Sequence, residues 1–473
     1  MPKTRREFLA ASAGALAALA LPQAAWPRRS GPTTGAGFAS FQSEPSLQIP
    51  TLTVHTLDAP SPGYLFATTL TGPGQRGPMI FDDHGQPVWF RRTKNVAIDF
   101  RRQTYKGKPV LTWWEGTISK IGTGEGVGKI FDQSYRQIAE VRAGDGLQAD
   151  VHELLLTPQG TALITAYVEV TRDLSAIGGP SAHPTLDSVF QEVDLATGKV
   201  LLEWHSLDHV AITDTYSPIL SPFDYFHINS VDVAPDGNLL VSARNTWGVY
   251  KIDRKSGEVL WRLGSKSGDF QLGPGALFMF QHDARAHSDG TITLFDDGSG
   301  DLAHPGRAIR IGADERNRIA TLLQEYPHPA PLAVAAMGNA QVLQNDGVRV
   351  GWGTQPWITE FDALGDVRFD ASFDGGAWNY RAFRDVWVGR PAHPPAIARR
   401  GRTVYASYNG STQTAYWRLD GGPARNALAP LRTVPRAGFE TAIAIPGRPA
   451  YVAVTALDAA KQPLSTSRAL PAV

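Results

Sequence analysis

The stretch FDYFHINSV, residues 223–231, opens the segment that decides the fold of this chain. The segment continues through NLLVSAR (238–244), FQHDAR (280–285) and TITLFDDG (291–298). Short runs of β-forming residues alternate in it with glycine-containing turns, a pattern typical of antiparallel hairpins. Because the same strand–turn–strand pattern recurs along most of the chain, the segment predicts a β protein built from repeats.

An acidic turn followed by a strand that often ends in tryptophan recurs about every 50 to 60 residues, a period typical of propeller blades, each a four-stranded sheet. Its copies begin at Asp83, Asp194 and Asp253, with a weaker one at Asp362 and degenerate ones near residues 132 and 313. Six units fit between residues 61 and 420. The sequence therefore predicts an all-β fold, a six-bladed β-propeller, with several β-sandwiches as the alternative.

The two ends of the chain are predicted to lie outside this propeller. Arg5 and Arg6, followed by Phe8 and a short apolar run, resemble a twin-arginine export signal, predicted for residues 1–30; an ordinary secretory signal or a retained anchor is the alternative. Residues 31–60 are expected to form a leader and an edge strand. Residues 421–473 should add strands that make a small β-sandwich or close the last blade. We expect a periplasmic, cell-surface or secreted protein with no stable membrane span once the signal is removed.

Composition excludes several classes of function. Lys and Arg number 45, as do Asp and Glu, and this balance argues against a nucleic-acid partner. Cysteine is absent, which removes disulfides, thiolate metal sites and cysteine nucleophiles. The oligomeric state is not predictable from these features.

Three histidines occupy matched places in the repeat. His152, His227 and His282 lie 8, 10 and 8 residues before the turn glycines Gly160, Gly237 and Gly290, and Asn339 holds the matching place in the next unit. Since the innermost strand of each blade lines the central channel, these side chains should meet at one mouth of it. Arg244 ends the strand after the hairpin of His227 and is expected to point toward the same mouth.

The residue types alone leave two kinds of chemistry open. Three neutral imidazoles could hold a metal ion such as zinc, or form an anion site in which one histidine is a nucleophile. Glu153 and Asp283 are the carboxylates beside these histidines, and strand alternation should turn both to the opposite face. The glycine-rich run 122–128 is expected to be a flexible loop, and Asp296-Asp297-Gly298 an acidic turn rather than a calcium loop.

The ordered set of motifs resembles the bacterial arylsulfotransferase family over about residues 80 to 420, in particular its actinobacterial and fungal branch. The matching motifs are DVHE (150–153), HINS (227–230), QHD (281–283), GNAQ (338–341), GWG (351–353), YRAFR (380–384) and the segment 405–417. The set as a whole is far more specific than any one motif.

The resemblance implies an enzyme: a six-bladed propeller that moves a sulfuryl group from an aryl sulfate donor to a phenol acceptor. It implies ping-pong transfer through a sulfohistidine, with no nucleotide donor, cofactor or metal. His282 matches the family's nucleophile, His152 and His227 the assisting histidines, and Arg244 the arginine, while Asn229 and Asn339 are expected to contact substrate. A non-catalytic binding propeller and a histidine–metal hydrolase or lyase are the alternatives.

Overall fold

The computed structural model describes residues 37–472. The predicted export signal at residues 1–30 and the first part of the leader lie outside the described residues. Within them the chain is almost entirely β, with only the short helices α2 (Ser206–His209), η2 (Ser175–Ile177), η3 (Ile212–Asp214) and η4 (Asp374–Gly376). The predicted all-β class is confirmed. None of the helices in this part of the chain is long and apolar enough to cross a membrane.

Six sheets, each with an antiparallel path of at least four strands, follow one another along residues 52–385. Their strands are β7–β10 (Val96–Tyr105, Lys108–Ile118, Gly124–Phe131, Gln137–Val141), β11–β14 (Leu154–Leu156, Thr161–Arg172, His183–Asp194, Val200–His205), β16–β19 (Ile228–Val233, Leu239–Ala243, Gly248–Ile252, Val259–Gly264), β21–β24 (His282–Ala286, Thr291–Asp296, Arg307–Asp314, Ile319–Pro327), β25–β28 (Asn339–Val342, Val348–Gly351, Trp357–Phe361, Val367–Phe373), and β29 (Phe383–Asp385) with β4–β6 (Tyr64–Ala67, Met79–Phe81, Pro87–Phe90). Short β15 (Phe223–Asp224) and β20 (Gln271–Leu272) add to two of them by parallel pairing.

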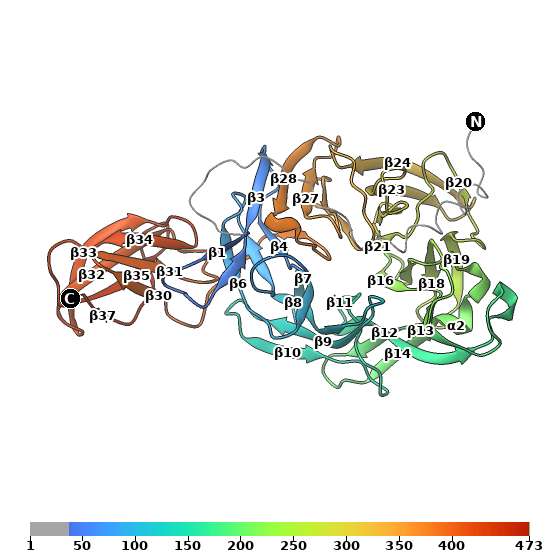
Figure 1. Ribbon diagram of the computed structural model, residues 1–473, viewed down its shortest axis with the longest axis horizontal. Coiled ribbons are helices and arrows are strands. Elements are labelled where there is room, and N and C mark those ends of the chain that lie inside the picture. The colour runs from blue at the N-terminus through green and yellow to red at the C-terminus, as the bar shows by residue number, and fades with distance from the viewer. Residues whose placement is uncertain (1–36, 473) are drawn as a thin grey trace.

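The sheets lie around a common centre, with β7, β11, β16 and β21 labelled nearest to it (Figure 1). One edge strand from each of the six sheets (β7, β11, β16, β21, β25 and β29) contributes to the wall of a single cavity of about 600 Å³. This is a propeller-like arrangement. The predicted turns at Gly160, Gly237 and Gly290 connect the first two strands of their sheets, and each glycine has the positive φ that such turns favour.

Strands from distant parts of the chain complete two of the sheets. β29 pairs with β4, so Phe383 lies opposite Phe66, and β3 (Leu52–Leu57) pairs with β28. The first strand of the ring, β3, therefore pairs with β28, and the last strand, β29, pairs with β4. These two pairings join the beginning and the end of the ring by backbone hydrogen bonds.

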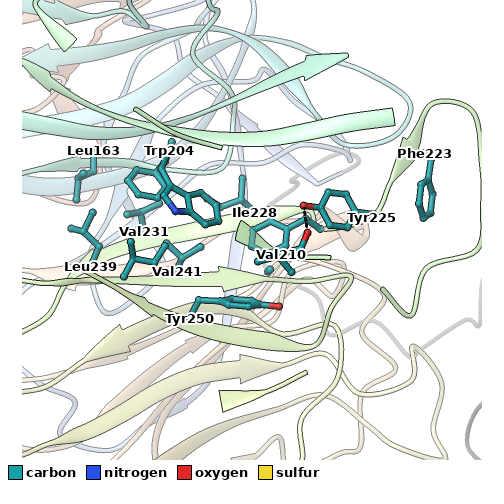
Figure 2. Close-up of a cluster of buried hydrophobic side chains, with 14 of the residues drawn as sticks. Leu163, Trp204, Val210, Phe223, Tyr225, Ile228, Val231, Leu239, Val241 and Tyr250 are labelled. Carbon is teal, nitrogen blue, oxygen red and sulfur yellow. Dashed lines mark hydrogen bonds between the residues drawn. The ribbon is translucent and has the colours of Figure 1, made fainter. Parts of the chain in front are cut away.

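Apolar side chains fill the space between neighbouring sheets. In one such layer Trp204 packs with Leu163 of its own sheet and with Val231 and Val241 of the next one (Figure 2). The expectation of a flexible loop at 122–128 is wrong for its second half, because β9 begins at Gly124. A side chain at Gly124 or Gly126 would overlap the indole of Trp114, so these glycines allow the strand to approach it closely.

Residues 396–471 lie beside the ring (Figure 1) as two small sheets that share one apolar core. Their strands are β30 (Ala396–Arg400), β31 (Thr403–Ser407), β32 (Tyr416–Ala424), β33 (Ala427–Pro435), β34 (Glu440–Ala444), β35 (Tyr451–Leu457), β36 (Pro463–Thr466) and β37 (Leu470–Pro471). Near the start of the described chain, β1 (Phe38–Ser40) pairs with β2 (Gln48–Pro50). The domain limits at residues 60 and 420 stay a prediction.

A buried ionic cluster occupies the middle of the ring. Arg101, Arg285 and Arg381 contact Asp99, Glu153 and Asp283 with nitrogen–oxygen distances of 2.5 to 3.3 Å. Asp99 and Arg101 come from β7, Asp283 and Arg285 from β21, and Glu153 and Arg381 lie just before β11 and β29. The expected turning of Glu153 and Asp283 to the opposite face is therefore wrong. For Asp283 the reason is a bulge: its φ is 56° and the pairing of β21 with β22 shifts between His282 and Arg285.

Replacing Arg381 by methionine should destabilise the protein by about 3–5 kcal/mol, because it leaves buried carboxylates without their partner. Arg381 is 1% exposed and also donates to the carbonyl oxygen of Asn229 at 2.9 Å. The midpoint of urea unfolding measures the loss. Arg316→Met, in an exposed turn, is the matched control. Equal midpoints for the two variants would contradict the predicted contribution of the ionic cluster to the free energy of unfolding.

Candidate active site

The structure brings the three predicted histidines together at one end of the inner strands. His282 is the first residue of β21, whereas His152 and His227 lie just before β11 and β16. All three are buried, with exposed fractions of 4% for His152, 8% for His227 and 2% for His282. The rings of His152 and His227 meet edge to face, with centroids 4.8 Å apart. The histidines thus form one group, although they come from three sheets.

Each histidine has an aspartate at its Nδ1 atom. The distance from Nδ1 to the nearest carboxylate oxygen is 2.5 Å for His152 and Asp150, 2.5 Å for His227 and Asp224, and 3.0 Å for His282 and Asp297. A carboxylate at Nδ1 favours the tautomer with the proton on that atom and leaves Nε2 with its lone pair. All three rings can therefore present Nε2 to a common substrate.

Sequence analysis missed these aspartates. Asp150 stands two residues before its histidine, Asp224 three before, and Asp297 fifteen after, so no shared spacing links them. Asp297 belongs to the segment expected to be an acidic turn, and its neighbour Asp296 does fit that expectation because it accepts the backbone N–H groups of Met279 and Gly298. Only a three-dimensional model reveals that Asp297 faces His282.

Asp150 is held by several donors besides His152. The backbone N–H of Gly124 donates to it at 2.6 Å, and the hydroxyl of Thr165 at 3.1 Å. Burial would raise the pKa of Asp150, but the interaction with His152 and these hydrogen bonds outweigh it, so the pKa is lowered. Asp150 therefore stays ionised beside the His152 ring.

His282 is held in its neutral form. Burial lowers its pKa well below the usual value, and the positive charges of Arg244 and the two other histidines lower it further. The backbone N–H of Met337 donates to its Nε2 at 3.3 Å, which agrees with a lone pair on that atom. The contact of Nδ1 with Asp297 is close, but its angle is not that of a hydrogen bond. Burial raises the pKa of Asp297 well above its usual value, although Arg244 opposes this.

Burial also lowers the pKa of His227, and Asp224 offsets this only in part. Two tyrosines border the histidine pair. The hydroxyl of Tyr380 donates to the carbonyl of His152 at 3.0 Å, and the hydroxyl of Tyr167 donates to the carbonyl of Ile228 at 3.1 Å. Both hydroxyls are bound to backbone and serve to fix the chain around the histidines.

Arg244 is close enough to His282 for its charge to lower the pKa of that histidine, and its guanidinium is fixed from three sides. Its guanidinium donates to the side-chain oxygen of Asn245 and to the carbonyl of Ala335, both at 3.0 Å, and lies 4.6 Å from the ring centre of Phe280. Its backbone N–H donates to the carbonyl of His227 at 2.9 Å. Burial lowers its pKa, which an arginine tolerates without losing its charge. The site therefore contains a positioned cation.

Asn229 and Asn339 bind backbone groups of neighbouring strands. Asn229 donates to the carbonyl of Gln281 at 2.7 Å. Asn339 donates to the carbonyl of Ala382 and accepts its N–H, at 3.0 and 2.8 Å. Both residues are fully buried, so in this structure they join adjacent inner strands, and their predicted contact with substrate stays a prediction.

Strained backbone gathers around the histidines. Among the described residues, 14 other than glycine have a positive φ, and five of these, His227, Trp247, Phe280, Asp283 and Met337, belong to the site or its border. Such conformations cost energy and persist where the surrounding structure enforces them, often at functional sites. The backbone is therefore set to position these side chains.

The ionic cluster forms the floor of the site. Glu153 follows His152 directly, Asp283 follows His282, and Arg381 follows Tyr380. The cavity of about 600 Å³ lies on the other side of this floor, lined by later residues of the inner strands such as Arg102, Asp232 and His287. The residues that line this cavity do not include the three histidines or Arg244, so it is not the histidine site. Within residues 37–472, no group of three or more histidine, aspartate or glutamate side chains is arranged to hold a metal ion.

Comparison with known proteins gives a family. The chain matches the family model described as Arylsulfotransferase (ASST) over residues 101–374, more than half of its 473 residues. No curated protein sequence matches it.

Similar solved structures include a protein of unknown function from Bacteroides caccae (14% identity, 68% of this chain and 98% of that one, TM-score 0.42). They also include the Dos1 propeller (12%, 73% of each chain, 0.32) and virginiamycin B lyase from Staphylococcus aureus (9%, 76% and 96%, 0.32). These likenesses are too low to carry an argument about function. The family match, which takes in all three histidines and Arg244, does carry one: the chain belongs to the arylsulfotransferase family.

Proposed function

We propose that this protein is a six-bladed propeller enzyme that transfers a sulfuryl group from an aryl sulfate to a phenol through a sulfohistidine at His282. The observation that carries the proposal is the neutral, buried His282 with its Nε2 lone pair beside the fixed cation Arg244. A nucleophile needs a free lone pair such as that on Nε2 of His282, and a bound sulfate ester needs a cation such as Arg244. Export by the predicted signal, to the periplasm, cell surface or medium, is part of the proposal.

In the first step Nε2 of His282 attacks the sulfur atom of the donor. The Nε2–S bond forms, the bond from sulfur to the phenolic oxygen breaks, and its electron pair leaves with that oxygen. Charge develops on the sulfuryl oxygens and on the leaving oxygen, so donors aimed at these atoms lower the barrier. Arg244 and the N–H of Met337, which faces Nε2 at 3.3 Å, are the groups placed to supply them.

Sulfation of Nε2 places a positive charge on the His282 ring, whose Nδ1 still carries a proton. The Asp297 carboxylate, 3.0 Å from Nδ1, neutralises that charge or takes the proton. Burial raises the pKa of Asp297, and the charge of Arg244 opposes this by favouring the carboxylate form that the step uses. We therefore assign Asp297 as the partner that stabilises the intermediate.

The departing phenolate takes a proton from the pair His152–His227. We assign His152 as the donor, because its Nδ1 lies 2.5 Å from the ionised Asp150, whereas the pKa of His227 is lowered by burial. The second step is the reverse with a new phenol, whose proton returns to the histidine as its oxygen attacks sulfur. Because the sulfuryl group rests on His282 between the two steps, the first phenol leaves before the second is sulfated, which gives ping-pong kinetics.

Incubation with 4-nitrophenyl sulfate and a phenol acceptor, without any nucleotide donor, should yield 4-nitrophenol and the acceptor's sulfate. With donor alone, one equivalent of 4-nitrophenol should appear as a burst, and mass spectrometry after alkaline digestion should find the added group on the His282 peptide. His282→Ala should abolish both burst and label. Arg244→Ala should slow the burst by roughly 10²–10³-fold, the typical effect of losing one such donor.

Full transfer by His282→Ala would end the covalent mechanism, and a label on His152 or His227 would reassign the roles. Failure to transfer across a broad phenol panel would favour a binding propeller. Loss of activity with a chelator and recovery with zinc would favour a metal enzyme.

Asp297→Asn should slow the burst by roughly 10²-fold or more, because a neutral amide cannot offset the charge on the sulfated ring. Asp301→Asn is the matched control, since Asp301 is exposed on the same loop. Stopped-flow absorbance of the released 4-nitrophenol gives both rates. Equal rates for the two variants would remove Asp297 from the mechanism.

Nuclear magnetic resonance of histidine ring carbons should show that His282 stays neutral between about pH 8 and 6, where a histidine with the usual pKa near 6.5 takes up its proton. Its lowered pKa places protonation at more acidic pH. His205 gives the opposite case, since Asp187 and Glu203 outweigh its burial and raise its pKa, so it should titrate above the usual value. His282→Gln and His205→Gln assign the two signals. A His282 signal that titrates at or above that of His205 would contradict the neutral nucleophile.

A further inference from the structure

A row of three aromatic rings, which we call the aromatic wall, begins at Arg244. It consists of Phe280, Trp247 and Tyr216. The Arg244 guanidinium lies 4.6 Å from the Phe280 ring centre, Phe280 meets Trp247 edge to face at 5.2 Å, and Trp247 stacks on Tyr216 at 3.9 Å. Trp247 is almost fully buried, whereas Phe280 and Tyr216 remain partly exposed.

The wall is connected to the reacting groups by short stretches of chain. Phe280 stands two residues before His282, and Trp247 three residues after Arg244. The N–H of Tyr216 donates to the carbonyl of Asn245 at 2.8 Å, and the side chain of Asn245 accepts from Arg244. The position of each ring is therefore fixed relative to the cation that faces the sulfuryl group.

Phe280 and Trp247 both adopt a left-handed backbone, with φ of 51° and 49°. Bulky residues rarely do so, because the side chain then crowds the backbone. Packing of an aromatic ring in a core needs no such conformation. Here it aims the Phe280 ring toward the guanidinium of Arg244, and part of that ring stays accessible.

We infer that Phe280 is the contact that makes the site select aromatic sulfates, with Trp247 and Tyr216 as its support. This inference rests on the proposed function and names the group that recognises the aryl part of donor and acceptor. With the sulfuryl group at Arg244 and His282, the organic part falls beside Phe280, which contacts Arg244 and stands two residues before His282. An aromatic ring gains there from pairing with Phe280 and from the nearby cation, whereas a saturated ring gains only from burial.

The test uses unreactive sulfonates, so it measures binding without turnover. Calorimetry on the full chain should show benzenesulfonate and 2-naphthalenesulfonate binding roughly 3- to 10-fold more tightly than cyclohexanesulfonate, the range expected for one aromatic pair. Phe280→Leu should remove that preference, and Phe280→Tyr should keep it. Phe41→Leu, a half-buried phenylalanine paired with Phe439, is the matched control and should keep it as well.

A Phe280→Leu variant that loses affinity for all three sulfonates equally would show that Phe280 only supports Arg244, which overturns the inference. Equal affinity of the unaltered protein for aromatic and saturated sulfonates would also overturn it. Transfer activity without any preference linked to Phe280 would leave the proposed function standing and remove this inference. A binding preference that depends on Phe280 in a protein without transfer activity would support Phe280 as the aromatic contact and contradict the proposed function.

Discussion

The buried ionic cluster in the middle of the ring is the interaction on which the site depends. The edge strands that meet there belong to different sheets, so no ladder of backbone hydrogen bonds joins them. Side chains take over this role: Asn229 and Asn339 bind the backbone of the next strand, and Arg381 bridges carboxylates from three others. Since ion pairs need close geometry to offset their desolvation, the cluster tolerates only one arrangement of these strands. That arrangement also sets His152 and His282, which stand directly beside Glu153 and Asp283 in the chain.

The pairing of each histidine with an aspartate follows from this fixed frame. An imidazole buried without a partner would have to leave Nδ1 unsatisfied or turn it toward substrate. Asp150 and Asp224, from the chain just before the histidine, bind Nδ1 of His152 and His227, whereas Asp297, which directly follows β22, approaches Nδ1 of His282 at 3.0 Å without a hydrogen bond. A carboxylate thus lies within 3.0 Å of Nδ1 in all three histidines, although the spacings in the chain differ.

Much of this could be predicted from sequence because it is periodic. The turns at Gly160, Gly237 and Gly290 recur with the repeat, and a recurring unit must place equivalent residues at equivalent positions. That reasoning brought His152, His227 and His282 together and added Arg244. It failed where the structure departs from the repeat. The bulge at Asp283 breaks the alternation of side chains between the two faces of the strand. Gly124 and Gly126 lie in a strand, where the lack of a side chain lets the backbone approach the indole of Trp114. The contact of Asp297 with His282 could not be predicted from sequence, because it results from the pairing of β21 with β22 and not from the spacing of the two residues.

The arrangement of charge explains how one site can bind an anion and still hold a neutral nucleophile. Proteins that bind sulfate with protonated histidines lose the lone pair that attack on sulfur requires. Here the cation is Arg244, which keeps its proton even when burial lowers its pKa. The same charge lowers the pKa of His282 and so keeps it neutral. When donor binds, its sulfate offsets the charge of Arg244, yet the burial of His282 remains and is the larger cause of its lowered pKa. In the proposed mechanism His282 therefore stays unprotonated both before and after the donor arrives, and the proton for the leaving oxygen comes from the separate pair His152–His227.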